Sequence, residues 1–312
     1  MTRRDDRAWC TPKGLPQEVL AFGAEVQGGL GVGAAGKLGV LDLAVAPRAG
    51  RTRVVRQYQR SPLYIYRPIY LDPLRPGMAF VFLQQQGDGF VQGDRYRVDI
   101  DCAAGSAVHV TTQAATKVFR AQDDFATQLV NLQVGAGGVL EYLPDPVIPF
   151  RGSRLYQRTC LTVADDATAI LGEILLPGRV ARDELHVYDL FWADTEVRAP
   201  DGSLLFADTL RLRPGEMDAP GAPGVLGEYD VVAGLYVLCP ATPAAELVAA
   251  LRDALAGVPD ILAGVTELPA GRGAAVRILG HRSKVVQAAM RTAWDRARRE
   301  VLGAPAPDLR KG

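Results

Sequence analysis

Most of this chain consists of short segments in which apolar and polar residues alternate at every second position. In residues 96–101, Tyr96, Val98 and Ile100 fall on one face, and charged residues fall on the other. Similar strand character is found at 38–47, 129–134, 155–163, 168–176, 184–192, 210–213 and 274–279. A period of two is typical of strands with one buried face, so the fold is predicted to be mainly β.

Glycine and proline separate these segments, for example at Pro76-Gly77, at 135–138 and at Asp201-Gly202. Many short strands with frequent turn signals favour one large strand assembly, either antiparallel or β-helix-like. The sequence contains no repeat, so it does not by itself specify a regular solenoid.

Two main helices are predicted near the end of the chain. The first is expected to have Thr242 as its cap, Pro243 in its first turn and Gly257 at its end. The second is expected to span 283–302 and to stop at Gly303. Its apolar stripe comprises Val286, Met290, Ala293, Ala297 and Val301, and four arginines are expected to lie largely off it: Arg291, Arg296, Arg298 and Arg299.

Three regions are expected along the chain. Residues 1–17 form a flexible polar leader, 18–225 a β-rich domain, and 226–312 a C-terminal strand-helix-strand-helix subdomain packed on the same unit. A loop rich in proline and glycine, at about 214–227, separates the last two regions.

Charge and cysteine content argue against several classes of protein. Lysine plus arginine and aspartate plus glutamate each number 35, so no net basic field is present to bind nucleic acid. No apolar run is long enough to cross a bilayer, and no signal-peptide core follows Arg3-Arg4. The cysteines are widely spaced, which predicts reduced, mostly buried thiols. A cytoplasmic location is expected.

The glycine-rich segment from Gly31 to Lys37 resembles two nucleotide-binding motifs. Both motifs need a helix directly after the glycines, whereas residues 38–47 alternate like a strand. Leu38 also stands where a phosphate-binding loop needs serine or threonine. A glycine-rich hairpin turn is the favoured interpretation, and a nucleotide-dependent enzyme is an alternative.

The histidines, His109, His186 and His281, are too far apart in sequence to form a recognisable metal site. His109 lies between Val108 and Val110 and is expected to point away from their face. No Gly-x-Ser-x-Gly motif is present. The chain is therefore expected to bind no cofactor stably and not to be a hydrolase.

Several polar residues occur where a plain β-core would need none: Thr111, Thr112, Gln113, Lys117, Glu141, Asp145 and Glu173. A buried carboxylate is costly unless it is paired, and Arg179 or Arg182 is the expected partner of Glu173. The other two carboxylates are expected to be solvated or to pair with Arg151 or Arg154. Two interpretations stay open: these residues satisfy backbone groups and ion pairs, or they line an internal polar passage or a partner-docking edge.

Several segments, taken in order, resemble the UreD (UreH) family of urease accessory proteins. They include Gln92-Gly93-Asp94, Thr111 to Arg120, Leu140 to Phe150, Gly178 to Glu184 and Val276 to Gly280. One departure is Asp183, which stands where the family more often has glycine, the residue that favours a left-handed turn.

The resemblance implies a β-rich chaperone with a helical end that acts in urease maturation. Its implied partners are the urease apoprotein, UreF and the GTPase UreG, with the nickel carrier UreE acting indirectly. Nickel would be handled transiently in an internal passage, with Thr111, Thr112, Glu141, Asp145 and Glu173 as its candidate lining. The candidates for partner binding or structural roles are Asp94, Gln113, Lys117, Arg179, Arg182 and Glu184. Oxygen ligands suit transient passage better than a His/Cys cage.

The main alternative is a β-rich ligand- or carbohydrate-binding module. Such a module needs an exposed aromatic platform, to which Tyr64, Tyr66 and Tyr70 could contribute. The same tyrosines could equally belong to the core or to a partner interface.

Overall fold

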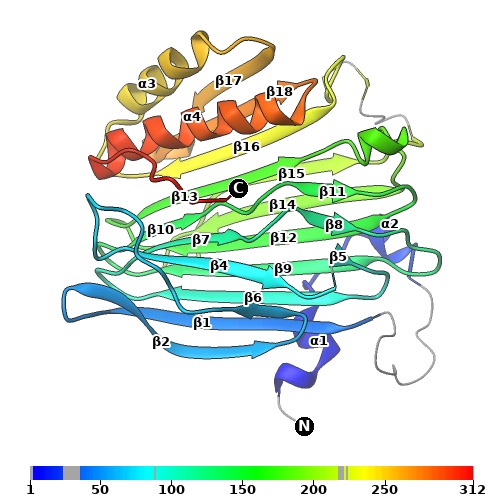
Figure 1. The fold of residues 1–312 in the computed structure, drawn as a ribbon, viewed down its shortest axis with the longest axis horizontal. Helices are drawn as coiled ribbons and strands as arrows, with labels where there is room; N and C mark the ends of the chain where they lie inside the picture. Colours follow the sequence, from blue (N-terminus) through cyan, green and yellow to red (C-terminus); the bar gives the residue numbers. More distant parts are fainter. Residues whose placement is uncertain (1–2, 24–35, 88, 217–220, 223, 312) are drawn as a thin grey trace.

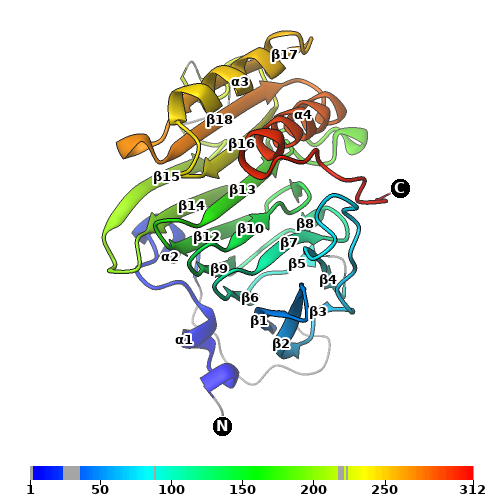
Figure 2. The ribbon, with the colours of Figure 1, turned by 90° about the vertical axis from the view of Figure 1, so that its left-hand side faces the viewer.

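The computed structural model describes residues 3–23, 36–87, 89–216, 221–222 and 224–311. Two β-sheets lie face to face around an apolar interior, and two long helices lie at one end of the assembly (Figures 1 and 2). The mainly β class predicted from the alternating pattern is confirmed.

The first sheet has seven strands. In spatial order they are β15 (Leu204–Leu212), β14 (Leu190–Arg198), β12 (Arg154–Val163), β9 (Ala126–Val134), β6 (Arg95–Cys102), β1 (Leu38–Arg48) and β2 (Arg51–Arg60). The strands from β14 to β1 pair in parallel, and β15 and β2 form the two edges through antiparallel pairs.

The second sheet has eleven strands. Its main path runs through β17 (Ile261–Glu267), β18 (Gly273–Gly280), β16 (Val231–Leu238), β13 (Thr168–Leu175), β10 (Val139–Tyr142), β7 (Ala107–Thr112), β4 (Ala79–Gln85) and β3 (Leu63–Ile65). Three short strands pair beside this path: β5 (Gly89–Phe90), β8 (Thr116–Val118) and β11 (Val147–Pro149). The strands from β4 to β13 pair in parallel, whereas those at either end pair antiparallel.

The parallel strands form successive coils of a β-solenoid. Equivalent positions in neighbouring strands of the second sheet are held by Ala79, Val108, Leu140 and Ala169. All four side chains are fully buried, although the sequences around them show no repeat. The β-helix-like alternative therefore describes the centre of the molecule, and the antiparallel pairs lie at the ends of both sheets.

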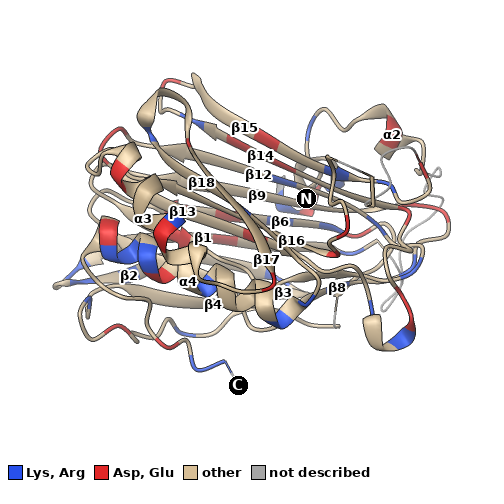
Figure 3. Ribbon diagram, turned by 90° about the horizontal axis from the view of Figure 1, so that it is seen from above, with Lys and Arg blue, Asp and Glu red and all other residues tan. Residues whose placement is uncertain are grey.

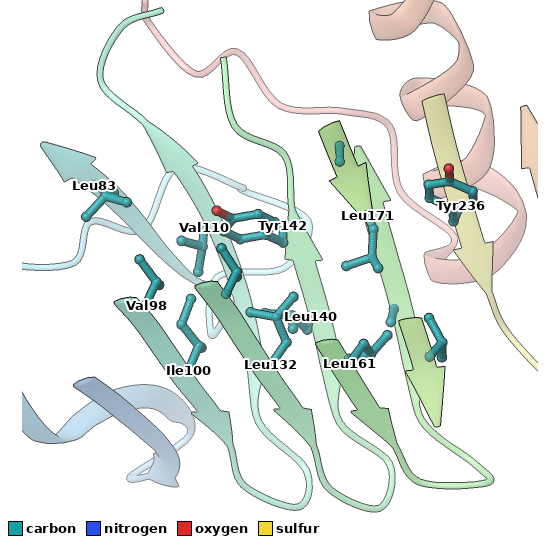
Figure 4. Close-up of a cluster of buried hydrophobic side chains, with 14 of the residues drawn as sticks. Leu83, Val98, Ile100, Val110, Leu132, Leu140, Tyr142, Leu161, Leu171 and Tyr236 are labelled. Atoms are coloured by element: carbon teal, nitrogen blue, oxygen red, sulfur yellow. The ribbon is translucent and has the colours of Figure 1, made fainter. Parts of the chain in front are cut away.

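Apolar side chains from both sheets meet inside the solenoid (Figure 4). In β6 the residues predicted to share the inner face, Tyr96, Val98 and Ile100, are buried, and the alternating residues are half-buried. Leu132 of β9 and Leu140 of β10 belong to the same cluster. The alternating pattern identified the inner face correctly because each strand packs that face against the opposite sheet.

Two helices, α3 (Ala244–Ala256) and α4 (Ser283–Leu302), pack on β16, β17 and β18. The predicted bounds of α4 are confirmed, and Gly303 ends the helix with a φ of 64°. For α3 the cap residue is Pro243 instead of the predicted Thr242, while Gly257 ends the helix as predicted. Of the helices in the described part of the chain, none combines the length and apolar character needed to span a membrane.

The C-terminal region contains one strand more than predicted, β17, between α3 and β18. Strand β16 pairs along its length with β13, so this region extends the second sheet directly. A boundary near residue 226 stays a prediction.

Two short helices, α1 (Arg7–Cys10) and α2 (Gln17–Leu20), precede β1. The Arg97 guanidinium donates a hydrogen bond to the Trp9 carbonyl at 2.8 Å, and Arg4 pairs with Asp42 of β1. The described part of the leader thus contacts the first sheet, and the flexibility expected for residues 1–17 stays a prediction.

The strand predicted over 184–192 begins only at Leu190. The residues before it form turns, and Asp183 adopts a left-handed conformation with a φ of 55°. The left-handed turn is therefore present although aspartate replaces glycine there, because aspartate tolerates this conformation better than most residues.

Replacement of Asp183 by glycine is expected to change the free energy of unfolding by less than about 1 kcal/mol. Glycine relieves the left-handed strain but loses more chain entropy on folding. Asp183→Val is expected to lower the free energy of unfolding by about 1–2 kcal/mol, because a β-branched residue resists a positive φ. Urea unfolding measures both variants, and equal stability of the two would contradict this account.

Candidate functional site

A groove of about 850 Å³ lies between α4, the segment 308–311 and the ends of β7 and β10. Its polar and charged lining residues are His109, Thr111, Gln113, Asp145, Lys284, Gln287, Arg291, Trp294, Asp308, Arg310 and Lys311. Seen from above, basic and acidic residues are interspersed along α4, which forms one wall (Figure 3). The groove therefore brings together segments that are far apart in the sequence.

Behind the groove, an internal cavity of about 60 Å³ lies between the two sheets. Its polar lining comes from both sheets and includes Thr112, Thr116, Gln128, Gln157, Thr159, Glu173, Asp194 and Thr195. The groove and the cavity share Pro144, Asp145, Gly172 and Ile174. A second space of about 20 Å³ shares Glu173 with the cavity and reaches Arg277. The groove, the cavity and this second space therefore share lining residues, and Glu173 lines the two inner spaces.

Asp145 lies at the junction of the groove and the cavity, in the loop between β10 and β11. Its two carboxylate oxygens accept hydrogen bonds from Lys311, each 2.9 Å from Nζ. The Thr112 hydroxyl donates to the same carboxylate at 3.2 Å. Lys311 also donates to Thr111 Oγ1 at 2.7 Å. Three of the predicted lining residues are therefore neighbours at this junction.

Glu173 lies on β13 and lines both internal spaces. Its carboxylate is 3.4 Å from Arg277, which also pairs with Asp208. The Tyr236 hydroxyl donates a hydrogen bond to Asp208. Burial raises the pKa of Glu173, and Arg277 offsets only part of this effect. A carboxyl group with a shifted pKa beside a polar cavity is a candidate functional group.

The predicted ion-pair partners of these two carboxylates are wrong. Asp145 pairs with Lys311 instead of Arg151 or Arg154, at a separation of 166 positions in the sequence. Glu173 pairs with Arg277 instead of Arg179 or Arg182, at a separation of 104 positions. Spacing in the sequence gives no signal for pairs this distant, because they form only when the coils stack.

Glu141 lies apart from the cavity, in a charged cluster between the second sheet and α4. It is fully buried, its Oε2 atom is 2.6 Å from His109 Nδ1, and both of its oxygens are 3.0 Å from the Arg298 guanidinium. Arg298 also pairs with Asp72. Burial alone would raise the pKa of Glu141, but the hydrogen bond and charge of His109 and the charge of Arg298 outweigh burial and lower it. These contacts give Glu141 a structural role.

Neither buried partner of Glu141, His109 or Arg298, was predicted from the sequence. Arg298 was predicted to lie largely off the buried stripe of α4, and this is wrong because its side chain is 0% exposed. Trp294, one turn earlier on the same face, is also buried and indicates a wider apolar face than the predicted stripe. The His109 ring lies 5.1 Å from the Phe80 ring and 5.2 Å from the Trp294 ring.

Asp94 and Glu184, two of the remaining candidates, have mainly structural contacts. Asp94 is fully buried and accepts hydrogen bonds from the Lys37 and Val91 amides and from the Tyr96 hydroxyl. It thereby fixes the turn before β6.

Glu184, also buried, accepts a hydrogen bond from Arg179 Nε at 2.7 Å, and this bond lowers the pKa of Glu184. The other candidates, Gln113, Lys117 and Arg182, are exposed or half-buried, so their side chains reach the surface.

The beginning of β1 argues against the nucleotide-binding alternative. Residues 31–35 lie outside the described residues, but Gly36 and Lys37 are followed directly by β1. Both nucleotide motifs would need a helix at this point.

Within the described ranges, no group of three or more His, Cys, Asp or Glu residues is placed to hold a metal ion. All four cysteines are free, and three of them are buried, as predicted. Tyr64 and Tyr66 stand edge to face at 85°, so they present no common flat surface for stacking a sugar.

Comparison with known proteins identifies close relatives over nearly the whole chain. A family model described as UreD urease accessory protein matches residues 37–311. The chain is 47% identical over 293 residues to Urease accessory protein UreD 2 of Streptomyces griseus, covering 94% of this chain and 100% of that protein. It is 41% identical over 286 residues to Urease accessory protein UreD of Haloarcula marismortui, covering 90% and 92% of the two chains. It is 37% identical over 284 residues to Urease accessory protein UreD of Cenarchaeum symbiosum, covering 91% of this chain and 99% of that protein.

Proposed function

The chain belongs to the UreD family of urease accessory proteins, and from this membership we propose that it is a non-enzymatic chaperone that passes nickel to urease. Its relatives are named as urease accessory proteins, which supports a role in urease maturation. The proposal adds that nickel moves through the interior of this chain.

The observation that carries the proposal is the series of spaces between the groove and Glu173. Asp145 lies where the groove meets the cavity, and Glu173 lines the cavity and the space beyond it. Between them the lining contains threonine hydroxyls and glutamine amides, for example Thr159 and Gln157. A purely structural core would fill this volume with apolar side chains.

The chemistry of the lining suits an ion that must leave again. Carboxylate, hydroxyl and amide oxygens bind a borderline metal such as nickel more weakly than imidazole or thiolate groups do. Conduction requires sites that bind strongly enough to admit the ion and weakly enough to release it. Nickel is accordingly the cargo of this chain, and the chain needs no stable cofactor.

Such a role requires partners that supply and receive the ion. We propose that the chain acts in the cytoplasm in a complex with UreF and the GTPase UreG on the urease apoprotein, with UreE supplying nickel indirectly. The exposed candidates Gln113 and Arg182 are available for partner contacts.

Asp145→Asn and Glu173→Gln are each expected to lower the nickel content and activity of urease by roughly tenfold, a loss typical when a group that tunes a metal site is removed. The measurement is co-expression of each variant with urease and the other accessory proteins, beside cells that lack this chain. Asp165→Asn is the control, because the Asp165 side chain is 80% exposed on the surface, where it pairs with Arg272. Full activation by both variants would refute the passage.

A further inference from the structure

The segment 304–311 returns from the end of α4 along the groove. The Ala306 amide donates a hydrogen bond to Asp295 Oδ1 at 2.8 Å. Ala304 is buried, and Leu309 packs against the cluster that contains Met78 and Phe80. These contacts hold the segment in place independently of the side chain of Lys311.

The Lys311 ammonium group stands where a cation entering the passage would bind. Its Nζ atom is 2.9 Å from both Asp145 oxygens and 2.7 Å from Thr111 Oγ1, so its three donors are satisfied by oxygen atoms. The side chain is only 20% exposed. Burial lowers the pKa of Lys311, and Asp145 counteracts this effect. The ammonium group is thus held mainly by one carboxylate.

A divalent cation cannot share Asp145 with this ammonium group. Two positive charges on one carboxylate would lie a few ångströms apart in a partly buried site, where their repulsion is much stronger than in water. Because Asp145 lines both the groove and the cavity, an ion that enters by this route must meet Lys311 first.

We propose that Lys311 is a tethered cation that closes the groove end of the passage, and that a divalent metal ion enters only by displacing it from Asp145. This inference rests on the proposed passage of nickel. Its consequence is selectivity: an ion enters only if it binds the Thr111–Asp145 oxygens better than the tethered ammonium does, which disfavours monovalent ions. When the ion moves on, the ammonium group returns to Asp145.

Binding of Ni²⁺ alone to the full chain, measured by equilibrium dialysis, tests the proposal. Lys311→Met removes the charge and keeps most of the side-chain length, so it is expected to lower the apparent Kd by about tenfold, as removal of a tethered competitor would. Lys311→Arg keeps the charge and is expected to behave more like the unmodified chain. Lys13→Met removes an exposed lysine that does not line the groove and is expected to have no effect.

Asp145→Asn distinguishes a failure of the tethered cation from a failure of the proposed passage. If Asp145→Asn loses binding and Lys311→Met gains it, and the double variant resembles Asp145→Asn, the tethered cation is supported. If Asp145→Asn loses binding but Lys311→Met resembles the unmodified chain, the passage stands and the tethered cation is refuted. If Asp145→Asn binds Ni²⁺ as the unmodified chain does, the groove end of the passage is refuted, and the tethered cation with it.

A labelling experiment on the unmodified chain gives an independent result. Acetylation of Lys311, followed by mass spectrometry, is expected to become several-fold faster when Ni²⁺ is added, because the displaced amine becomes accessible. Acetylation of Lys13, an exposed lysine that does not line the groove, provides the internal reference. Equal rates at Lys311 with and without Ni²⁺, at concentrations where the ion binds, would overturn the proposal.

Discussion

Replacement of Arg298 by methionine is expected to lower the free energy of unfolding by about 3–5 kcal/mol, the usual cost of leaving a buried charge without its partner. Arg298 is fully buried and pairs with both Glu141 and Asp72. Without the guanidinium, two buried carboxylates remain: Glu141 keeps its contact with His109, and Asp72 keeps the hydrogen bonds donated by two backbone amides. Methionine fills much of the same volume, so the loss comes mainly from charge and only slightly from packing.

The measurement is urea unfolding of the Arg298→Met chain beside an Arg299→Met control. Arg299 is the next residue on α4, its side chain is 54% exposed, and it pairs with Asp295 one turn away. Exposed pairs of this kind contribute about 0.3–0.5 kcal/mol. Similar losses in the two variants would show that the buried cluster does not hold α4 on the sheet. A loss that appears only in Arg298→Met would confirm that it does.

In this cluster the bounds of the helix could be predicted from the sequence, but the buried charge could not. The bounds of α4 were predicted correctly because a glycine in the left-handed region and an apolar stripe are local signals. The buried position of Arg298 was not predicted, because its partners Glu141 and Asp72 are 157 and 226 positions away. A charged residue at the border of an apolar stripe is normally exposed, and only the assembled fold reverses that expectation.

The solenoid was also only partly predictable from the sequence. Alternation predicted the inner face of β6 because this strand meets an apolar interior. The parallel stacking of coils was not specified, since Val108 and Leu140 are equivalent positions in unrelated local sequences. Backbone hydrogen bonds between coils do not depend on side-chain identity, so this architecture leaves little periodic trace in the sequence.

For the candidate site, the residue types were predicted better than their contacts. Of the five residues predicted to line a passage, Thr112, Asp145 and Glu173 line the cavity, Thr111 lines the groove, and Glu141 lines neither. A role of these residues in passing an ion stays a prediction. Lys311 was not predicted at this site, because the segment that carries it reaches Asp145 only after α4 has packed on the sheet. The basic residue in each of these ion pairs was therefore not predicted from the sequence.

Filling the cavity, without removing any oxygen ligand, is expected to stop nickel transfer. Ala193 is buried in β14 and lines the cavity, so Ala193→Leu adds three carbon atoms to a space of about 60 Å³. The ion would then meet an apolar obstruction between Asp145 and Glu173, and pore width is decisive for passage. The nickel content and activity of co-expressed urease are expected to fall nearly to the level of cells that lack this chain.

Overfilling a core costs about 1–3 kcal/mol, so the experiment must separate a blocked cavity from a loss of folded protein. Ala207→Leu is the matched control, because Ala207 is exposed on the neighbouring strand β15 and receives the same three carbons. The amount of folded chain, and its recovery with the urease complex, are measured for both variants. If folded Ala193→Leu still activates urease fully, nickel does not travel through the cavity, and Asp145 and Glu173 must act at the surface of a complex instead. If it joins the complex and leaves urease without nickel, the interior of the solenoid is the route.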